Sequence, residues 1–113
     1  MTRLVRGVVA LPAETPATPA ARVLVEVRDV SLADAPSTVV AAQVLTDVPL
    51  SPHGRFPFSV EVPDLDPAAT YGLRVHIDLA GTGSVESGDL INTRSITVPA
   101  EPTDVLTAPV SAV

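Results

Sequence analysis

Apolar and polar residues alternate with a period of two along most of the chain. Residues 22–30 place valine at alternate positions, with mostly charged side chains between them. Residues 55–62 and 71–79 alternate in a similar way. This period is typical of half-buried antiparallel strands, in which successive side chains point to opposite faces of the sheet. The pattern therefore predicts a strand in each of the three segments.

The strand predicted at 71–79 has two distinct faces. Tyr71 and every second residue after it are apolar and are expected to face the core, whereas His76 and Asp78 are expected to face solvent. Tyr71 follows an Asp-Pro turn at the start of this strand, as in the tyrosine corner of β-sandwiches. In that corner the tyrosine hydroxyl hydrogen-bonds back across the connection, so we expect Tyr71 to have a structural role.

Prolines mark the limits of two further predicted features. Residues 39–48 are apolar at both alternating sets of positions, so both faces are expected to be mostly buried. Alanine leaves a helix as the alternative here, but paired valines and the flanking Pro36 and Pro49 favour a strand. In the strand at 55–62, Pro57 has no N–H to donate to a ladder, which predicts an edge or bulged strand.

The remaining pattern completes an all-β fold. Twelve prolines interrupt the chain at intervals too short for long helices. About seven to eight short strands predict a single antiparallel β-sandwich domain, immunoglobulin-like or transthyretin-like, over residues 1–113. A small closed β-barrel is the alternative. The additional strands are expected at 4–10, 90–91, 95–98 and 105–110.

Composition narrows the possible classes of function. The 113 residues are enough for one domain with one core. The net charge is −6, with no lysine, so nucleic-acid binding is not expected, because phosphate contacts need a concentrated basic face. The absence of cysteine excludes disulfides, thiolate metal sites and a lipidated cysteine within these residues. No apolar run reaches about 18 residues, so we expect no membrane insertion by this chain.

Two places along the chain carry residue types that bind metal ions. His76 and Asp78 are two residues apart on one strand face and can supply two ligands, whereas His53 lies alone in a turn. Asp64 and Asp66 can supply oxygens to calcium, but the spacing of a calcium-binding loop is missing. Structural roles are favoured for all of them, and no metal or cofactor is expected.

No catalytic arrangement is predicted. Ser31 with Asp29 and Asp34 has the residue types of a hydrolase, but no nucleophile-elbow motif surrounds the serine. Residues 81–84, Gly-Thr-Gly-Ser, resemble a phosphate loop without the lysine and helix that would hold a phosphate, so a hairpin turn is expected. The sequence predicts a protein that is not an enzyme.

One segment is specific enough to indicate a family. Residues 29–36 read Asp-Val-Ser-Leu-Ala-Asp-Ala-Pro and directly follow the strand sequence Val-Leu-Val-Glu-Val-Arg. With Val-Arg-Gly-Val-Val at 5–9, Phe-Pro-Phe at 56–58 and Tyr-Gly-Leu-Arg-Val at 71–75, the chain resembles the YbaY-type lipoproteins. These are grouped with the YscW-type lipoprotein chaperones, or pilotins, of type III secretion systems. The resemblance covers roughly residues 4–98.

The resemblance implies a small bacterial β-sandwich outside the cytoplasm, tethered by a lipidated cysteine. It implies that pilotin members help an outer-membrane secretin ring to localise and assemble, and it implies no enzymatic activity. This chain shows neither that cysteine nor a leader sequence. With its present start the chain is expected in the cytoplasm, whereas removal of a leader would place it in the periplasm or at the outer membrane.

Two hypotheses for function follow. The first is a non-catalytic protein-binding or scaffold domain, which contacts another protein through an exposed strand edge, such as that of residues 55–62, or through residues 29–36. The second is a carbohydrate- or small-ligand-binding sandwich. Sugar-binding surfaces usually present exposed aromatic rings, whereas the three aromatic residues here face inward by pattern.

The loop at residues 29–36 has two interpretations. In the structural one, its aspartates and serine cap backbone N–H groups, and its leucine is buried beneath the turn. In the functional one, the loop docks a partner and the leucine is exposed beside the acids. We expect a buried leucine and at least one locally hydrogen-bonded aspartate. The residues concerned are Asp29, Ser31, Leu32, Asp34 and Pro36.

Overall fold

The computed structural model describes residues 2–32, 35–99 and 105–113, and every regular element within them is a β-strand. In the part of the chain that is described, no helix has the length and apolar character needed to cross a membrane. The strands are β1 (Arg3–Ala10), β2 (Pro19–Asp29), β3 (Thr38–Pro49), β4 (Arg55–Val62), β5 (Tyr71–Asp78), β6 (Leu90–Ile91), β7 (Thr97–Val98), β8 (Leu106–Pro109) and β9 (Ser111–Ala112).

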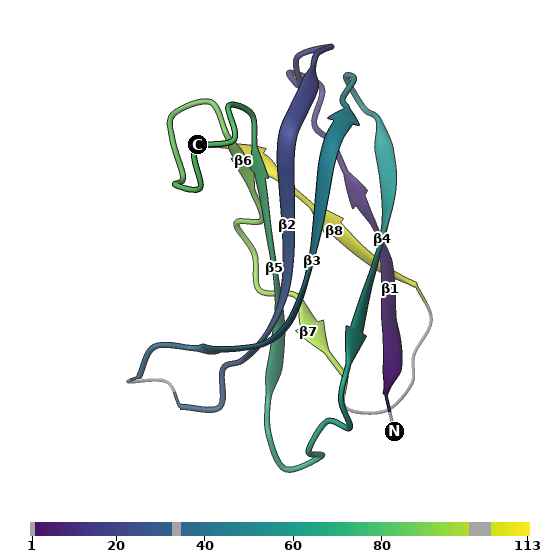
Figure 1. Ribbon diagram of the computed structural model, residues 1–113, viewed down its shortest axis with the longest axis vertical. Helices are drawn as coiled ribbons and strands as arrows, with labels where there is room; N and C mark the ends of the chain where they lie inside the picture. Colours follow the sequence, from purple (N-terminus) through teal and green to yellow (C-terminus); the bar gives the residue numbers. More distant parts are fainter. Residues whose placement is uncertain (1, 33–34, 100–104) are drawn as a thin grey trace.

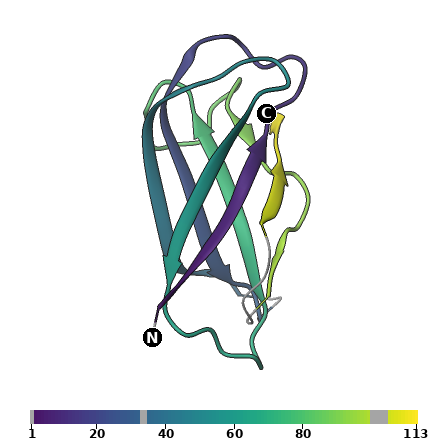
Figure 2. The same ribbon diagram turned by 90° about the vertical axis from the view of Figure 1, so that its right-hand side faces the viewer.

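The strands form two sheets that face each other as the layers of a sandwich (Figure 1, Figure 2). The smaller sheet has the order β4-β1-β8, and the larger has the order β3-β2-β5-β6-β9, with β7 also paired with β5. The predicted β-sandwich is confirmed, and the closed-barrel alternative is wrong because the sheets are separate. Neighbouring strands run antiparallel, except that β1 and β8 run parallel.

Valine is the commonest residue of the core between the sheets, as the alternating pattern predicts. Val23, Val25 and Val27 of β2 are fully buried, and they face a layer that includes Val9 of β1 and Val60 of β4. Short branched side chains suit this position because their stiff χ1 costs little entropy on a pleated surface. The core therefore forms from the same alternating positions that predict the strands.

Gly7 of β1 is required where three strands meet. It is paired with Phe58 of β4 on one side and with Leu106 of β8 on the other. A Cβ atom at Gly7 would lie 2.2 Å from Phe58 Cζ and 2.5 Å from the Leu106 carbonyl oxygen. A larger residue would therefore displace the aromatic ring or the third strand of the smaller sheet.

β3 is a strand, as predicted, but its expected burial is wrong. Most of its residues are exposed or half-buried, and Val39 and Val44 are 43% and 50% exposed. The reason is its position at the edge of the larger sheet, where it has β2 on one side only and an outer face turned to solvent. The helix alternative for this segment is wrong as well.

β4 forms an edge of the smaller sheet, as its internal proline predicts. Pro57 has no N–H, and the Ser59 N–H donates to Gln43 Oε1 of β3 at 2.8 Å. Backbone groups that point to the same side of a strand recur at every second residue, so Pro57 and Ser59 share the outward side. A strand added from another protein would find two successive outward positions of β4 blocked.

Candidate docking site

The segment after β2 lies at the end of the sandwich where β4 connects to β5 (Figure 1). Asp29 Oδ1 accepts the Ser31 N–H at 2.9 Å, and Ser31 Oγ accepts the Thr70 N–H at 2.8 Å. The Val30 N–H donates to the Thr70 carbonyl at 2.8 Å. The hydroxyl and the N–H of Ser31 hold the pKa of the Asp29 carboxyl below its ordinary value. These bonds fasten residues 29–31 to the start of β5.

Leu32 is exposed, and the expectation that it is buried is wrong. Its exposed fraction is 73%, and that of Val30 is 42%. Both residues follow the last paired residue of β2, and Figure 1 shows the connection extending beyond the sheets, so no core lies beneath it. Pro36 is exposed too, whereas Asp34 lies outside the described residues.

Tyr71 lies at the same end and bonds to the turn that precedes it. Its hydroxyl accepts the Asp66 N–H at 2.9 Å, and the residue is 7% exposed. Asp66 Oδ1 in turn accepts the Ala68 N–H at 2.9 Å. The stabilising role of a tyrosine corner stays a prediction for this hydroxyl. Residues 30–32 and 63–70 together are called the Leu32 end of the sandwich.

A groove of about 540 Å³ runs beside β5 and is called the β5 groove. Its walls are the first residues of β5 and the segment from β6 to β7, with Val30 of the Leu32 end at its border. Gly72 keeps the groove open because it has no side chain. A Cβ atom there would make ordinary contacts, 3.6 Å to Val30 Cγ1 and 3.8 Å to the Ile96 carbonyl oxygen. The volume is in the range of pockets that bury a bound group.

Asn92 holds the far wall of the β5 groove. Its Oδ1 accepts the Val75 N–H at 2.8 Å, and its Nδ2 donates to the Leu73 carbonyl at 3.1 Å. The Leu73 N–H donates to the Ile96 carbonyl at 2.9 Å. β6 and β7 pair with opposite ends of β5. Between them, the Asn92 side-chain amide makes the hydrogen bonds to β5 that a neighbouring strand would otherwise make. Asn92 was not predicted as a site residue, since a lone asparagine in a polar segment carries no distinctive signal.

Three arginines line the β5 groove in a chain with a net charge of −6. Arg28 bonds to Glu26 at 3.4 Å and to Ser37 Oγ at 2.7 Å. Arg74 and Arg94 are exposed on either wall. No aspartate or glutamate is among the groove's lining residues in the described part of the chain. The groove is therefore a local concentration of positive charge on an acidic protein.

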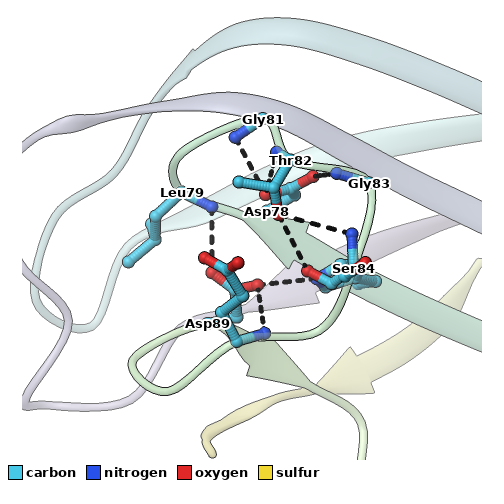
Figure 3. Close-up of polar contacts among 9 residues, drawn as sticks. Asp78, Leu79, Gly81, Thr82, Gly83, Ser84 and Asp89 are labelled. Carbon is cyan, nitrogen blue, oxygen red and sulfur yellow. Dashed lines mark hydrogen bonds and ion pairs between the residues drawn. The ribbon is translucent and has the colours of Figure 1, made fainter.

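The opposite end of the sandwich is built around a buried carboxylate. Asp78, at the end of β5, is 1% exposed. Its Oδ1 accepts the N–H groups of Gly81 and Thr82 at 2.9 and 3.2 Å, and its Oδ2 accepts the Gly83 N–H at 2.8 Å (Figure 3). Residues 79–89, which fold around this side chain, are called the Asp78 end.

Asp89 closes the same connection from its other side. Its Oδ1 accepts the Leu79 N–H at 3.1 Å, and its Oδ2 accepts the Glu86 N–H at 3.0 Å. His76 Nε2 lies 2.9 Å from Asp89 Oδ2. Burial raises the pKa of Asp78 and of Asp89, but the hydrogen bonds to each outweigh it, so the pKa of both carboxyls is lowered. Both side chains are therefore held as carboxylates.

The expectation that His76 and Asp78 face solvent is wrong. They are 6% and 1% exposed, because residues 79–89 fold over the outer face of β5. Residues 81–84 lie within this connection, which joins the antiparallel strands β5 and β6, so the expected hairpin has a long loop in place of a tight turn. Its amides are directed at Asp78 and not at an open site, so they do not form a phosphate loop.

His76, Asp78 and Asp89 form the metal-ligand cluster of the described residues, with one ligand atom from each within 4.8 Å of the others. All three are buried, and the four carboxylate oxygens already accept five backbone N–H groups and the histidine contact. A cation would have to displace these donors, which hold the connection in place. The arrangement thus fits a structural role better than metal binding.

The other candidate residues do not assemble into a reactive site. Ser31 Oγ is occupied by the Thr70 N–H at the Leu32 end, whereas His76 contacts Asp89 at the opposite end. His53 is exposed in its turn with a φ of 56°. Within the described ranges, Asp64 and Asp66 belong to no group of three potential metal ligands. Among the described residues, the structure therefore offers a groove and an exposed loop, and the candidates do not gather as a set of catalytic groups.

Comparison with known proteins identifies the class to which this two-sheet sandwich belongs. A solved structure described as an alternative pilotin from the type II secretion system of Vibrio cholerae matches with a TM-score of 0.69 and 26% sequence identity. The match covers 97% of this chain and 94% of that chain. The comparison with curated proteins gave no match.

The family is shown by a second finding. The family model described as type III secretion system lipoprotein chaperone (YscW) matches residues 1–107. The chain therefore belongs to the YscW family, which confirms the resemblance seen in the sequence. The family and the structural neighbour indicate a secretion-system chaperone, and a non-catalytic binding role is consistent with both.

Proposed function

We propose that this protein is a non-catalytic chaperone that binds a subunit of an outer-membrane secretin ring. The observation that carries the proposal is the match to a pilotin over nearly the whole of both chains. Membership of a family of secretion-system lipoprotein chaperones supports it. A chaperone that binds another protein needs an accessible surface and does not need a reactive centre.

The Leu32 end and the β5 groove supply such a surface. Leu32 and Val30 are exposed apolar side chains, and Val30 also borders the groove. Exposed apolar groups next to a concave site are typical of protein-binding surfaces. Asp29 and Ser31 fix the backbone of this loop without burying its leucine. The loop is therefore both ordered at its base and available to a partner.

Strand addition is the second mode of binding that the sequence suggested, and it fits β3 better than β4. β4 is blocked at Pro57 and Ser59, whereas β3 is an edge strand with no charged side chain in residues 38–46. A long uncharged edge is a template for pairing with another strand. The carbohydrate-binding alternative has less support, because Phe56, Phe58 and Tyr71 are each at most 9% exposed.

Binding to a secretin tests the proposal. The protein is mixed with the C-terminal segment of the secretin subunit encoded in the same genome, and the affinity is measured by biolayer interferometry. We expect saturable binding, and we expect no binding of a secretin N-terminal domain used as the control. Failure of every secretin segment from that genome to bind would contradict the proposal.

A further inference from the structure

The β5 groove differs in charge from the rest of the molecule. The chain has thirteen acidic and seven basic residues, yet three of the basic residues line this one groove. All of the charged side chains that line the groove are arginines. Arg28 is neutralised in part by Glu26, while Arg74 and Arg94 remain exposed. A cleft lined by one sign of charge attracts and orients a partner of the opposite sign.

The lining of the groove also offers apolar side chains to a partner. Val30, Ile91 and Ile96 contribute to it, and Gly72 leaves space above the strand, whereas the side chains of Tyr71 and Leu73 face the core. The backbone of β5 at this point is already bonded, through Asn92 and the Ile96 carbonyl. A partner therefore cannot add a strand to β5 here, and it must bind through its side chains.

We propose that the β5 groove binds an acidic segment of the partner protein, with apolar side chains over Gly72 and carboxylates at Arg74 and Arg94. This inference rests on the proposed function, since the partner segment would belong to the secretin. Arginine suits the task because its planar guanidinium forms paired hydrogen bonds with a carboxylate. The exposed Val30 and Leu32 extend the apolar contact beyond the groove.

Substitution of Gly72 tests whether the groove is the binding site. Its φ lies outside the left-handed region and a Cβ there would make only ordinary contacts, so Gly72→Val is compatible with the strand. The added side chain would occupy part of the groove beside Val30. We expect Gly72→Val to weaken binding of the secretin segment by about tenfold or more, with no loss of thermal stability. Unchanged affinity in the folded variant would overturn the proposal.

Charge reversal tests the chemistry of the partner. We expect Arg74→Glu and Arg94→Glu each to weaken binding by about tenfold, with an effect that shrinks as salt is added. Arg55→Glu is the matched control, because Arg55 is an exposed arginine of the smaller sheet and lies outside the groove. It should change the affinity by less than about twofold. Equal effects of all three substitutions would show only general attraction between charges and would contradict a specific acidic site.

A peptide-display selection separates the groove from the proposed function. A random peptide library is selected on the wild-type protein and counter-selected on the Gly72→Val variant. Enriched peptides should combine aspartate or glutamate with apolar residues and should lose binding to Gly72→Val. Enrichment of neutral or basic peptides, or no enrichment, would overturn the proposal that the groove binds an acidic segment. If acidic peptides bind while no secretin segment does, the groove is supported as a site for acidic segments and the secretin proposal fails.

Discussion

An aspartate ends a strand at each end of the sandwich, and the two aspartates have different surroundings. Asp29 accepts one backbone N–H, from Ser31, beside the exposed Leu32. Asp78 accepts three backbone N–H groups and is 1% exposed. Both carboxylates organise the connection that follows their strand. Only the second connection closes over its aspartate and buries it.

The difference lies in what each connection leaves free. At the Asp78 end, the carboxylates of Asp78 and Asp89 are hydrogen-bonded by the loop itself, so a ligand would have to compete with these N–H donors. At the Leu32 end, polar groups fix the base of the loop while Val30 and Leu32 stay in solvent. The acidic residues of the Asp78 end are therefore used by the fold, whereas the Leu32 end leaves apolar side chains accessible.

The largest expected effect on stability is at the Asp78 end. Asp78→Ala would leave three N–H groups without their acceptor and a gap in a buried site, which we expect to lower the free energy of unfolding by about 2–4 kcal/mol. Asp29→Ala is the matched substitution at the Leu32 end, and it should have a smaller effect because that carboxylate has solvent around it. Urea unfolding measures both variants. Equal losses would remove the distinction between the two ends.

Acid should act on the Asp78 end as well. The pKa of Asp78 and of Asp89 is lowered from 3.8 in the folded protein, so each contributes stability above the unfolded-state pKa. This contribution is lost as the pH falls through the folded-state pKa. We expect unfolding midpoints to be constant between neutral pH and about pH 5 and to fall below about pH 4. The loss of stability at acidic pH should be smaller for Asp78→Asn. An identical loss in that variant would contradict the role assigned to the Asp78 carboxylate.

Tyr71 tests how much of the Leu32 end is structural. Tyr71→Phe removes the acceptor of the Asp66 N–H, and we expect a loss of about 1 kcal/mol in the free energy of unfolding. Asp66 itself is exposed, so water can replace part of this bond. Chemical denaturation of the two proteins decides the point. An unchanged midpoint would mean that the hydroxyl has no role in holding the turn.

Leu32 should have the smallest effect on stability and a clear effect on binding. Because it is 73% exposed, Leu32→Ser should change the free energy of unfolding by less than about 0.5 kcal/mol. The same variant should bind the secretin segment more weakly, if the loop contacts the partner. A large loss of stability would show that the side chain is needed by the fold and would contradict the functional interpretation of the loop.

The sequence predicted the elements of the fold because their causes are local. The alternation at residues 22–30, 55–62 and 71–79 led to β2, β4 and β5, and Pro57 correctly indicated an edge strand. Burial was harder to predict, because it depends on which connection covers a face. Asp78 has a solvent-facing pattern, yet residues 79–89 bury it.

The candidate site was predicted only in part, for the same physical reason. Residues 29–36 drew attention through their composition, but whether Leu32 is buried depends on how far the loop extends beyond the sheets. The β5 groove was missed, because it requires β6 and β7 to pair with opposite ends of β5 and Asn92 to bridge the gap. Nothing in the local pattern of residues 91–97 indicates this arrangement.

Amide hydrogen exchange in the free protein and in its complex with the secretin segment tests the central claim most directly. We expect slower exchange on binding in residues 91–97, which line the β5 groove, and in residues 30–32, of which Val30 borders it. We expect no change in residues 79–89, several of whose amides already bond to Asp78 and Asp89. Slower exchange confined to residues 79–89 or to β3, with none at the groove, would contradict the account.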